Sequence, residues 1–165
     1  MDESIERLYG EFLKCVEIDY ILLRSLVTER VPWRLVPKKA KFEVDITGGE
    51  EVETVSENHI VIEVRLSIET KQSANHQETN GNEASDRTVF TIECSFEMGY
   101  SLSLSPSLKR ELSSLEDDGT YLKKIVELFA RRNCRLNVWP YVREIVQSIT
   151  TRMGFPPLII PLYKE

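Results

Sequence analysis

Three stretches of the chain alternate strictly between apolar and polar residues, at 41–47, 59–70 and 88–101. A period of two places successive side chains on opposite faces of a strand, so each stretch predicts a strand with one buried face. The inward-facing residues are then Phe42, Val44 and Ile46; Ile60, Ile62, Val64, Leu66 and Ile68; and Phe90, Ile92, Cys94, Phe96, Met98 and Tyr100. A sheet with one solvent-exposed face is typically antiparallel. The strands of a parallel sheet, which is covered on both faces, would show unbroken apolar runs instead.

A fourth strand is expected over 17–31, where leucine and β-branched residues lack clean alternation, which indicates a bulge or a twist. Gly48 and Gly49 are expected to end the strand at 41–47, and the acidic stretch 49–57 to be a solvated loop. Residues 72–86 are polar with little apolar content, so we expect a mobile hairpin loop between the last two strands.

Helical spacing of apolar residues appears before and after these strands. An amphipathic N-terminal helix is expected within 1–16, and shorter helices over 108–115 and 121–129. A long helix is expected over 137–153, with Asn137 as its N-cap, Pro140 tolerated in its first turn and Gly154 as its stop. An apolar extended tail, 155–165, follows this helix.

The length and the net charge of the chain limit the classes of protein to which it can belong. The 165 residues are expected to form one domain, 1–165, and 21 Lys and Arg against 27 Asp and Glu give a net charge of −6. This balance, without a basic cluster longer than two residues, argues against nucleic acid as a partner. No apolar run approaches the ~20 residues that span a bilayer, and the first residues are acidic. We therefore expect no membrane insertion and a cytoplasmic location.

The sequence shows no constellation typical of catalysis. Cys15, Cys94 and Cys134 are widely separated and lack the paired spacing of zinc or redox motifs, so they are interpreted as reduced core thiols. His59 and His76 have no second ligand at metal-binding spacing. We expect no catalytic residue, no metal, no cofactor and no enzymatic activity.

The informative feature is a surplus of apolar elements. One sheet with a single packed face needs one or two helices, yet the chain offers several helices, Trp33, Trp139 and an apolar tail. Such a surplus favours burial against other subunits or a partner. On the long helix, the apolar stripe is wide enough to contact both its own sheet and a neighbouring subunit. The residues predicted for this oligomer interface are Tyr141, Val142, Ile145 and Ile149.

The segment 137–162 resembles the signature helix and tail of the SecB family of export chaperones. That signature has two parts, which are here Trp139, Pro140, Tyr141, Arg143 and Glu144, then Gly154, Phe155, Pro156 and Leu158. The order upstream, four antiparallel strands followed by helices, also matches that family. The fold that we expect is therefore α+β and SecB-like: a four-stranded antiparallel sheet packed with a long C-terminal helix, plus an extra N-terminal helix.

The resemblance implies an ATP-independent chaperone that holds unfolded or aggregation-prone polypeptides in apolar grooves. It also implies a homotetramer, built as a dimer of dimers with the long helices between two sheets. The residues that it suggests for client binding are Trp33, Phe42, Val44, Ile46, Trp139, Phe155, Leu158 and Ile160. The clients would be unfolded preproteins or an antitoxin, and SecA is a further partner of the export members.

The chain departs from the export members in two places. These members continue into a C-terminal helix and a SecA-contacting tail, whereas this sequence stops at Glu165. Their acidic sheet patch is matched only by Glu29 and Glu93, with Ser25 where an acid is expected. These departures, with the extra N-terminal helix, resemble the SecB-like chaperones of toxin–antitoxin systems.

Two alternatives stay open at the level of sequence. A structural oligomerisation module would explain the apolar surplus without a client. A hot-dog-type thioesterase would combine a small antiparallel sheet with a long helix. That enzyme needs a carboxylate or histidine in an apolar tunnel, and the long helix has no inward-facing acid.

Overall fold

The computed structural model describes residues 3–32, 42–72, 87–115 and 120–161 of the chain. In chain order the elements are α1 (Glu3–Leu13), β1 (Val16–Arg30), β2 (Phe42–Val55), β3 (His59–Gln72), β4 (Arg87–Leu102), α2 (Pro106–Leu115), α3 (Thr120–Phe129), the π-helical turn η2 (Ala130–Cys134) and α4 (Arg135–Arg152). Trp33 lies outside the described residues, as does the loop expected at 72–86 apart from Gln72, which ends β3.

The four strands form one antiparallel sheet with the order β1-β4-β3-β2. The central strands β3 and β4 bury every residue that their alternation assigned to the inner face, which confirms that prediction. The edge strand β1 shifts its register against β4 between Ile18 and Tyr20 and again between Leu23 and Ser25. The irregular strand predicted at 17–31 is therefore confirmed, with two irregularities.

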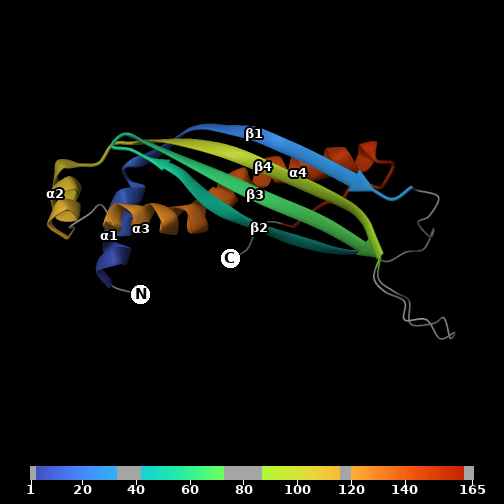
Figure 1. Cartoon of the computed structure of the whole chain (residues 1–165), viewed down its shortest axis with the longest axis horizontal. Coiled ribbons are helices and arrows are strands. Elements are labelled where there is room, and N and C mark those ends of the chain that lie inside the picture. The colour runs from blue at the N-terminus through green and yellow to red at the C-terminus, as the bar shows by residue number, and fades with distance from the viewer. Residues whose placement is uncertain (1–2, 33–41, 73–86, 116–119, 162–165) are drawn as a thin grey trace.

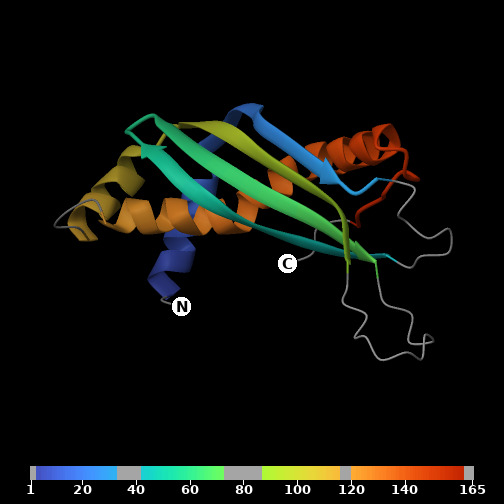
Figure 2. The same ribbon diagram turned by 45° about the vertical axis from the view of Figure 1, so that its right-hand side comes forward.

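The helices gather on one face of the sheet, as Figures 1 and 2 show, so the fold has a sheet layer and a helix layer. The core between them combines the inner residues of β3 and β4 with buried side chains of every helix. No helix in the described residues covers the opposite, outer face of the sheet. The predicted α+β class is confirmed, with its four-stranded antiparallel sheet, long C-terminal helix and N-terminal helix.

The prediction that Gly48 and Gly49 end the second strand is wrong. β2 runs through both glycines to Val55 and pairs with β3 along this whole length. A Cβ at Gly48 would overlap the backbone of Arg65 and the side chain of Leu66, so glycine here permits close approach of β3 rather than a turn. The acidic stretch after the glycines is therefore strand and not loop, and Glu50 points inward to Arg135 on α4.

The expected start of the long helix is also wrong. α3, η2 and α4 follow one another without a break, so Asn137 lies inside a helix and is not an N-cap. Its side-chain amide instead donates a hydrogen bond to the buried hydroxyl of Tyr100, at 3.2 Å. Pro140 lies within α4 rather than in the first turn of a helix.

The predicted end of the long helix is confirmed. Gly154 has a φ of 88°, a left-handed conformation that glycine adopts without steric cost. The amides of Gly154 and Phe155 donate to the carbonyls of Thr151 and Thr150, which is the Schellman arrangement of hydrogen bonds. The chain turns sharply at this point and returns beneath the sheet.

The N-terminal helix α1 packs against the α3–η2 segment at the opposite end of the molecule (Figure 1). Phe12 is fully buried and meets the ring of Phe129 edge to face, with centroids 5.7 Å apart. Arg132 donates two hydrogen bonds to Glu6, at 2.9 and 2.8 Å. An apolar contact and an ion pair therefore fix the extra helix in place.

Candidate functional site

The C-terminal tail, residues 155–161, returns along the helix-facing side of the sheet towards β2 (Figures 1 and 2). It enters beneath β4, where Phe155 stacks on Phe90 with ring centroids 5.1 Å apart. Phe90 is paired across the sheet with Thr70, which is paired with Val44 on β2. The tail therefore begins below the strand row that contains one of the predicted client-binding residues.

Side chains of α4 hold the tail by its backbone. Trp139 Nε1 donates to the carbonyl of Pro161 at 2.8 Å, and Arg143 Nε donates to the carbonyl of Ile160 at 3.2 Å. The Leu158 amide donates to Thr150 Oγ1 at 3.0 Å. The side chain of Ile160 is 2% exposed, whereas that of its neighbour Ile159 is 71% exposed. The tail is thus an extended segment with one side chain buried and the next in solvent.

The structure separates the predicted client-binding residues into two groups. Trp139, Phe155 and Ile160 are buried in the core of the single chain. Phe42, Val44, Ile46 and Leu158 retain exposed surface. Phe42, Val44 and Ile46 lie on the helix-facing side of β2, and Leu158 and Ile159 belong to the tail, whose backbone returns on that side; we call these five residues the β2–tail strip.

A buried hydroxyl accompanies this strip. Thr70 Oγ1 lies on β3 between Val44 and Phe90, and no hydrogen-bond partner is found for it among the described residues. Leaving a buried polar group unpaired costs about 1–3 kcal/mol.

Sequence analysis did not identify β1 as a functional element. Five apolar side chains of this edge strand are between 37% and 54% exposed, and they are Ile18, Leu22, Leu23, Leu26 and Val27. Their pairing with β4 places Leu23 and Leu26 opposite inner residues, and Leu22 and Val27 opposite outer ones. The missed signal is the apolar run 21–23, because apolar residues on both faces are typical of a strand that is covered on both faces.

The predicted oligomer-interface residues differ in their exposure. Tyr141 is an exposed aromatic residue on α4. Val142 is fully buried in the core, and Ile145 and Ile149 are partly buried against it. Of the four, Tyr141 presents the largest surface to a neighbouring subunit.

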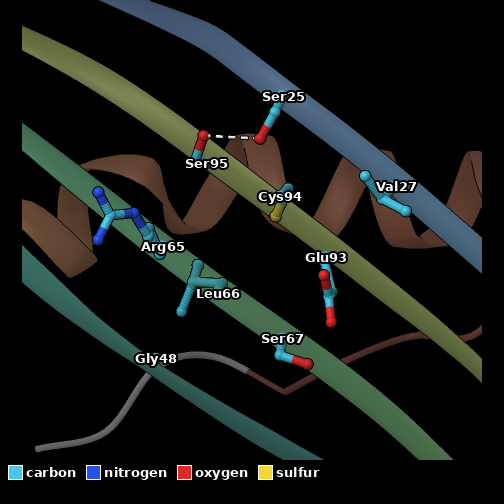
Figure 3. A pocket seen from close by; sticks show the side chains of 9 residues that line it. All are labelled: Ser25, Val27, Gly48, Arg65, Leu66, Ser67, Glu93, Cys94 and Ser95. Atoms are coloured by element: carbon cyan, nitrogen blue, oxygen red, sulfur yellow. Dashed lines mark hydrogen bonds between the residues drawn. The ribbon is translucent and has the colours of Figure 1, made fainter.

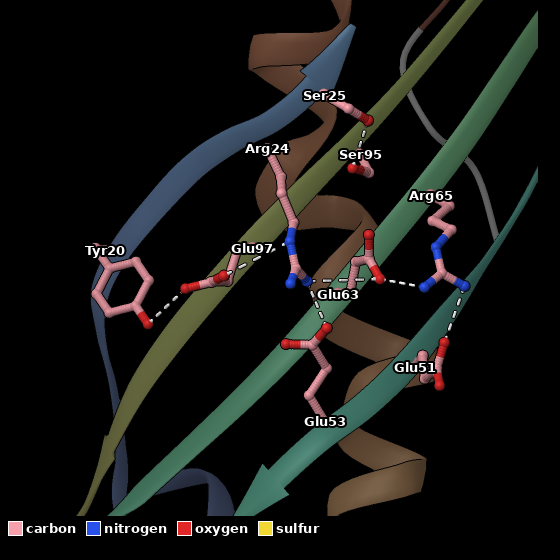
Figure 4. Close-up of polar contacts among 9 residues, drawn as sticks. All are labelled: Tyr20, Arg24, Ser25, Glu51, Glu53, Glu63, Arg65, Ser95 and Glu97. Carbon is pink, nitrogen blue, oxygen red and sulfur yellow. Dashed lines mark hydrogen bonds and ion pairs between the residues drawn. The ribbon is translucent and has the colours of Figure 1, made fainter.

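The outer face of the sheet carries a network of charged side chains, shown in Figure 4. Arg24 of β1 reaches across the sheet to Glu53 of β2 and lies 3.8 Å from Glu63 and 4.0 Å from Glu97. Arg65 binds Glu63 from the other side and donates to Glu51 at 2.9 Å. Four carboxylates near the middle of this face, those of Glu51, Glu53, Glu63 and Glu97, are thus engaged by two arginines of the same chain.

A shallow hollow of about 240 Å³ lies next to this network (Figure 3). Small residues line it together with Arg65, Leu66 and Glu93, and the hydroxyls of Ser25 and Ser95 are 2.8 Å apart there. No group of three metal-ligating side chains is placed to hold an ion in the part of the chain that the structure describes. The residues that line the hollow therefore do not point to a particular reaction.

All three cysteines are free thiols. Burial raises the pKa of the Cys94 thiol to about 11 and that of the Cys134 thiol to about 12. Cys134 also contacts the Tyr100 hydroxyl at 3.2 Å within the core. Both thiols are protonated at neutral pH and are poor nucleophiles. Across the described ranges, the structure shows no helix with the length and apolar character needed to cross a membrane.

Comparison with known proteins identifies a similar fold. No family model matches the sequence, and no curated protein matches it. Among solved structures, a SecB-like chaperone of Mycobacterium tuberculosis, in complex with a ChAD peptide from the HigA1 antitoxin, aligns with a TM-score of 0.63 and 17% identity, over 96% of this chain and 98% of that one. A protein of unknown function from Streptococcus agalactiae aligns over 88% of this chain and 96% of that chain, with 11% identity and a TM-score of only 0.38. The chain therefore has a SecB-like fold along nearly its whole length.

Proposed function

We propose that this protein is an ATP-independent chaperone that holds unfolded or aggregation-prone polypeptides on the β2–tail strip. The observation that carries this proposal is that β2 and the tail both keep apolar side chains exposed or only partly buried, while the backbone of the tail returns along the helix-facing side of the sheet. The similar SecB-like chaperone was solved with a peptide bound, which supports this class of function.

The chemistry of the strip suits an extended client with apolar side chains. Its members are aliphatic or aromatic. They therefore bind a client through the apolar surface that is buried on contact, and they do not select a particular sequence. Unfolded preproteins and an antitoxin both offer such segments, and we propose clients of this kind. Contact with SecA remains a prediction. The outer-face acids Glu29 and Glu93 would be its contacts, since the acids nearer the middle of this face are engaged by Arg24 and Arg65.

We also propose that the chaperone works as a homotetramer. A long edge strand with exposed apolar residues is prone to pair with another chain. Pairing β1 with β1 of a second copy would turn each edge into the middle of a larger sheet. The exposed face of α4, with Tyr141, would then join two such dimers. Both surfaces are uncovered in the single chain, which supports this assembly.

The test measures how well the protein suppresses the aggregation of a thermally unfolding reporter enzyme, followed by light scattering. Phe42→Asp places a charge on the strip at a residue that is 42% exposed, so the fold should survive. Thr47→Asp places the same charge on the same strand at an exposed residue of the outer face. We expect the wild type and Thr47→Asp to suppress aggregation and Phe42→Asp to lose most of this effect.

Two outcomes would contradict the proposal. If the folded wild-type oligomer leaves aggregation unchanged, the structural oligomerisation module is the better interpretation. If Phe42→Asp protects the reporter as well as Thr47→Asp does, clients bind elsewhere. Circular dichroism of each variant checks that a loss of protection does not come from unfolding.

A further inference from the structure

The three side chains that hold the tail lie on one line along α4. Trp139, Arg143 and Thr150 are four and seven residues apart, and at 100° per residue they fall within about 40° of one another around the helix. Over the same stretch the helix rises about 16 Å, which is the length of an extended segment of about five residues. We call these three residues the α4 row.

Within the described residues, the hydrogen bonds that the α4 row makes to the tail go to backbone atoms. Two of its hydrogen bonds go to the carbonyls of Ile160 and Pro161, and the third accepts the amide of Leu158. Recognition of this kind accepts many sequences, as in other sites that bind extended peptides by their main chain. The only fully buried side chain that we find in the segment 158–161 is Ile160.

We propose that the α4 row is a binding site for extended aliphatic peptides, which the chain's own tail fills in the free protein and a client segment displaces. The displacement step rests on the chaperone function proposed above, whereas the binding site rests on the contacts of the tail. The preferred ligand carries a branched aliphatic residue at the position of Ile160. A residue of any kind fits at the position of Ile159, because that side chain lies in solvent.

The charge and the hydrogen-bonding groups of the α4 row also limit which peptide sequences can bind. Arg143 and Trp139 are donors, so the ligand must leave two neighbouring carbonyls free. We identify only one ligand amide that the α4 row engages, that of Leu158, which makes proline acceptable at nearby positions, as Pro157 and Pro161 of the tail illustrate. An acidic residue in place of Ile160 would bury an unpaired charge and abolish binding.

The test measures binding of a fluorescent peptide with the sequence of residues 155–161 to the full-length chain, by anisotropy. The attached tail competes with the peptide at an effective concentration of about millimolar, so the wild type should bind weakly. Ile160→Ala weakens the attached tail without changing the α4 row, and we expect at least about tenfold tighter binding of the peptide. Ile159→Ala is the matched control and should stay within about twofold of the wild type.

A second measurement needs no variant. Hydrogen exchange of the wild type should show the Leu158 amide protected by Thr150 and exposed when excess peptide is added. If Ile160→Ala and Ile159→Ala bind the peptide equally, or if excess peptide leaves Leu158 protected, the tail is a permanent part of the core and the inference is wrong. A peptide with aspartate in place of Ile160 must fail to bind in both experiments.

These results are separate from the test of chaperone function. Suppression of reporter aggregation without peptide binding would uphold the proposed function and reject the α4 row as its site. Peptide binding that Ile160→Ala strengthens, in a protein that protects no reporter, would uphold the binding site and reject the chaperone role.

Discussion

Glu63 is a carboxylate near the middle of the solvent-facing side of the sheet, yet its side chain is only 7% exposed. Arg24 and Arg65 cover it from opposite sides, and each arginine also binds a second carboxylate, Glu53 or Glu51. Because Arg24 comes from β1 and Glu53 from β2, this pair ties the two edges of the sheet together across its outer face.

Replacing Arg24 with methionine keeps the length of the side chain but removes the charge that Glu53, Glu63 and Glu97 share. We expect a lower urea midpoint than the wild type at low salt, because the three carboxylates then repel one another. The loss should shrink in 1 M salt, which screens exposed charges. Lys14→Met removes an exposed pair at the end of α1 and should change the midpoint little. An Arg24→Met midpoint equal to that of the wild type would show that the network has no net effect.

The buried thiols predict a loss of stability at alkaline pH. Burial raises the pKa of Cys94 to about 11 and of Cys134 to about 12, from an ordinary value of 9.0. Above pH 9.0 the unfolded chain releases these protons and the folded chain does not, so the free energy of unfolding falls from there towards pH 12. Denaturant midpoints across this range should show the decline, with a shallower slope for Cys134→Ala. At pH 8, a thiol reagent should modify only the half-buried Cys15 until the protein unfolds.

At the scale of elements, the alternation of apolar and polar residues identified the strands that bury one face. It missed features that depend on how a strand packs against neighbouring strands. β3 and β4 follow a period of two from end to end, so their inner faces could be assigned without a structure. We predicted that the strand ends at Gly48 and Gly49 because glycine is common in turns. In the structure, however, the pairing of β2 with β3 continues through both residues. Only the three-dimensional arrangement shows that β3 approaches too closely for a side chain at Gly48.

The π-helical turn has a signal in the sequence that is clear only in retrospect. The buried residues Ile125, Phe129, Cys134, Val138 and Val142 are four residues apart except for one step of five. A step of five accommodates a π-turn, which rotates α3 relative to α4 so that both keep their apolar sides on the core. The sequence-based prediction did not use this spacing, and it therefore placed the start of a separate helix at Asn137.

Deleting Arg131, an exposed residue of the turn, tests this interpretation. The deletion restores a regular α-helix in which these buried residues follow one another every four residues, so Ile125 and Phe129 stay on the core. We therefore expect the protein to fold, and its thermal melting to show a loss of no more than the ~0.5–3 kcal/mol typical of a single mutation. Arg131→Ala keeps the register and should stay within about 0.5 kcal/mol. An unfolded deletion variant would contradict this interpretation.

For the whole molecule, the candidate site could be predicted only in part. The residues on β2 were correctly placed on the helix-facing side, because the alternation of that strand is local. The burial of Trp139, Phe155 and Ile160 could not be predicted, since it depends on the tail folding back along α4 after Gly154. The exposed edge of β1 was missed because strand order, which decides which strand has a free edge, is a property of the assembled sheet.

The last prediction concerns assembly, which uses the two surfaces that a single chain leaves uncovered. We expect light scattering of the wild type at micromolar concentration to give four times the chain mass of 19.1 kDa. Tyr141→Asp on α4 should halve this mass, because it breaks the contact between dimers. Leu26→Lys on β1 should also halve the mass, to dimers joined by α4, since an unpaired charge in a buried interface costs about 3–5 kcal/mol.

Gln147→Asp is the matched control on α4. It adds the same charge to an exposed polar position of the same helix and should leave the mass unchanged. A wild-type mass of 19.1 kDa at micromolar concentration would contradict the proposed tetramer. Since apolar residues lie on both faces of β1, assembly through α4 alone would leave this edge open to irregular pairing, and the protein should aggregate on standing. Slow aggregation of Leu26→Lys, with the tetramer of Gln147→Asp intact, would therefore identify β1 as the edge that assembly protects.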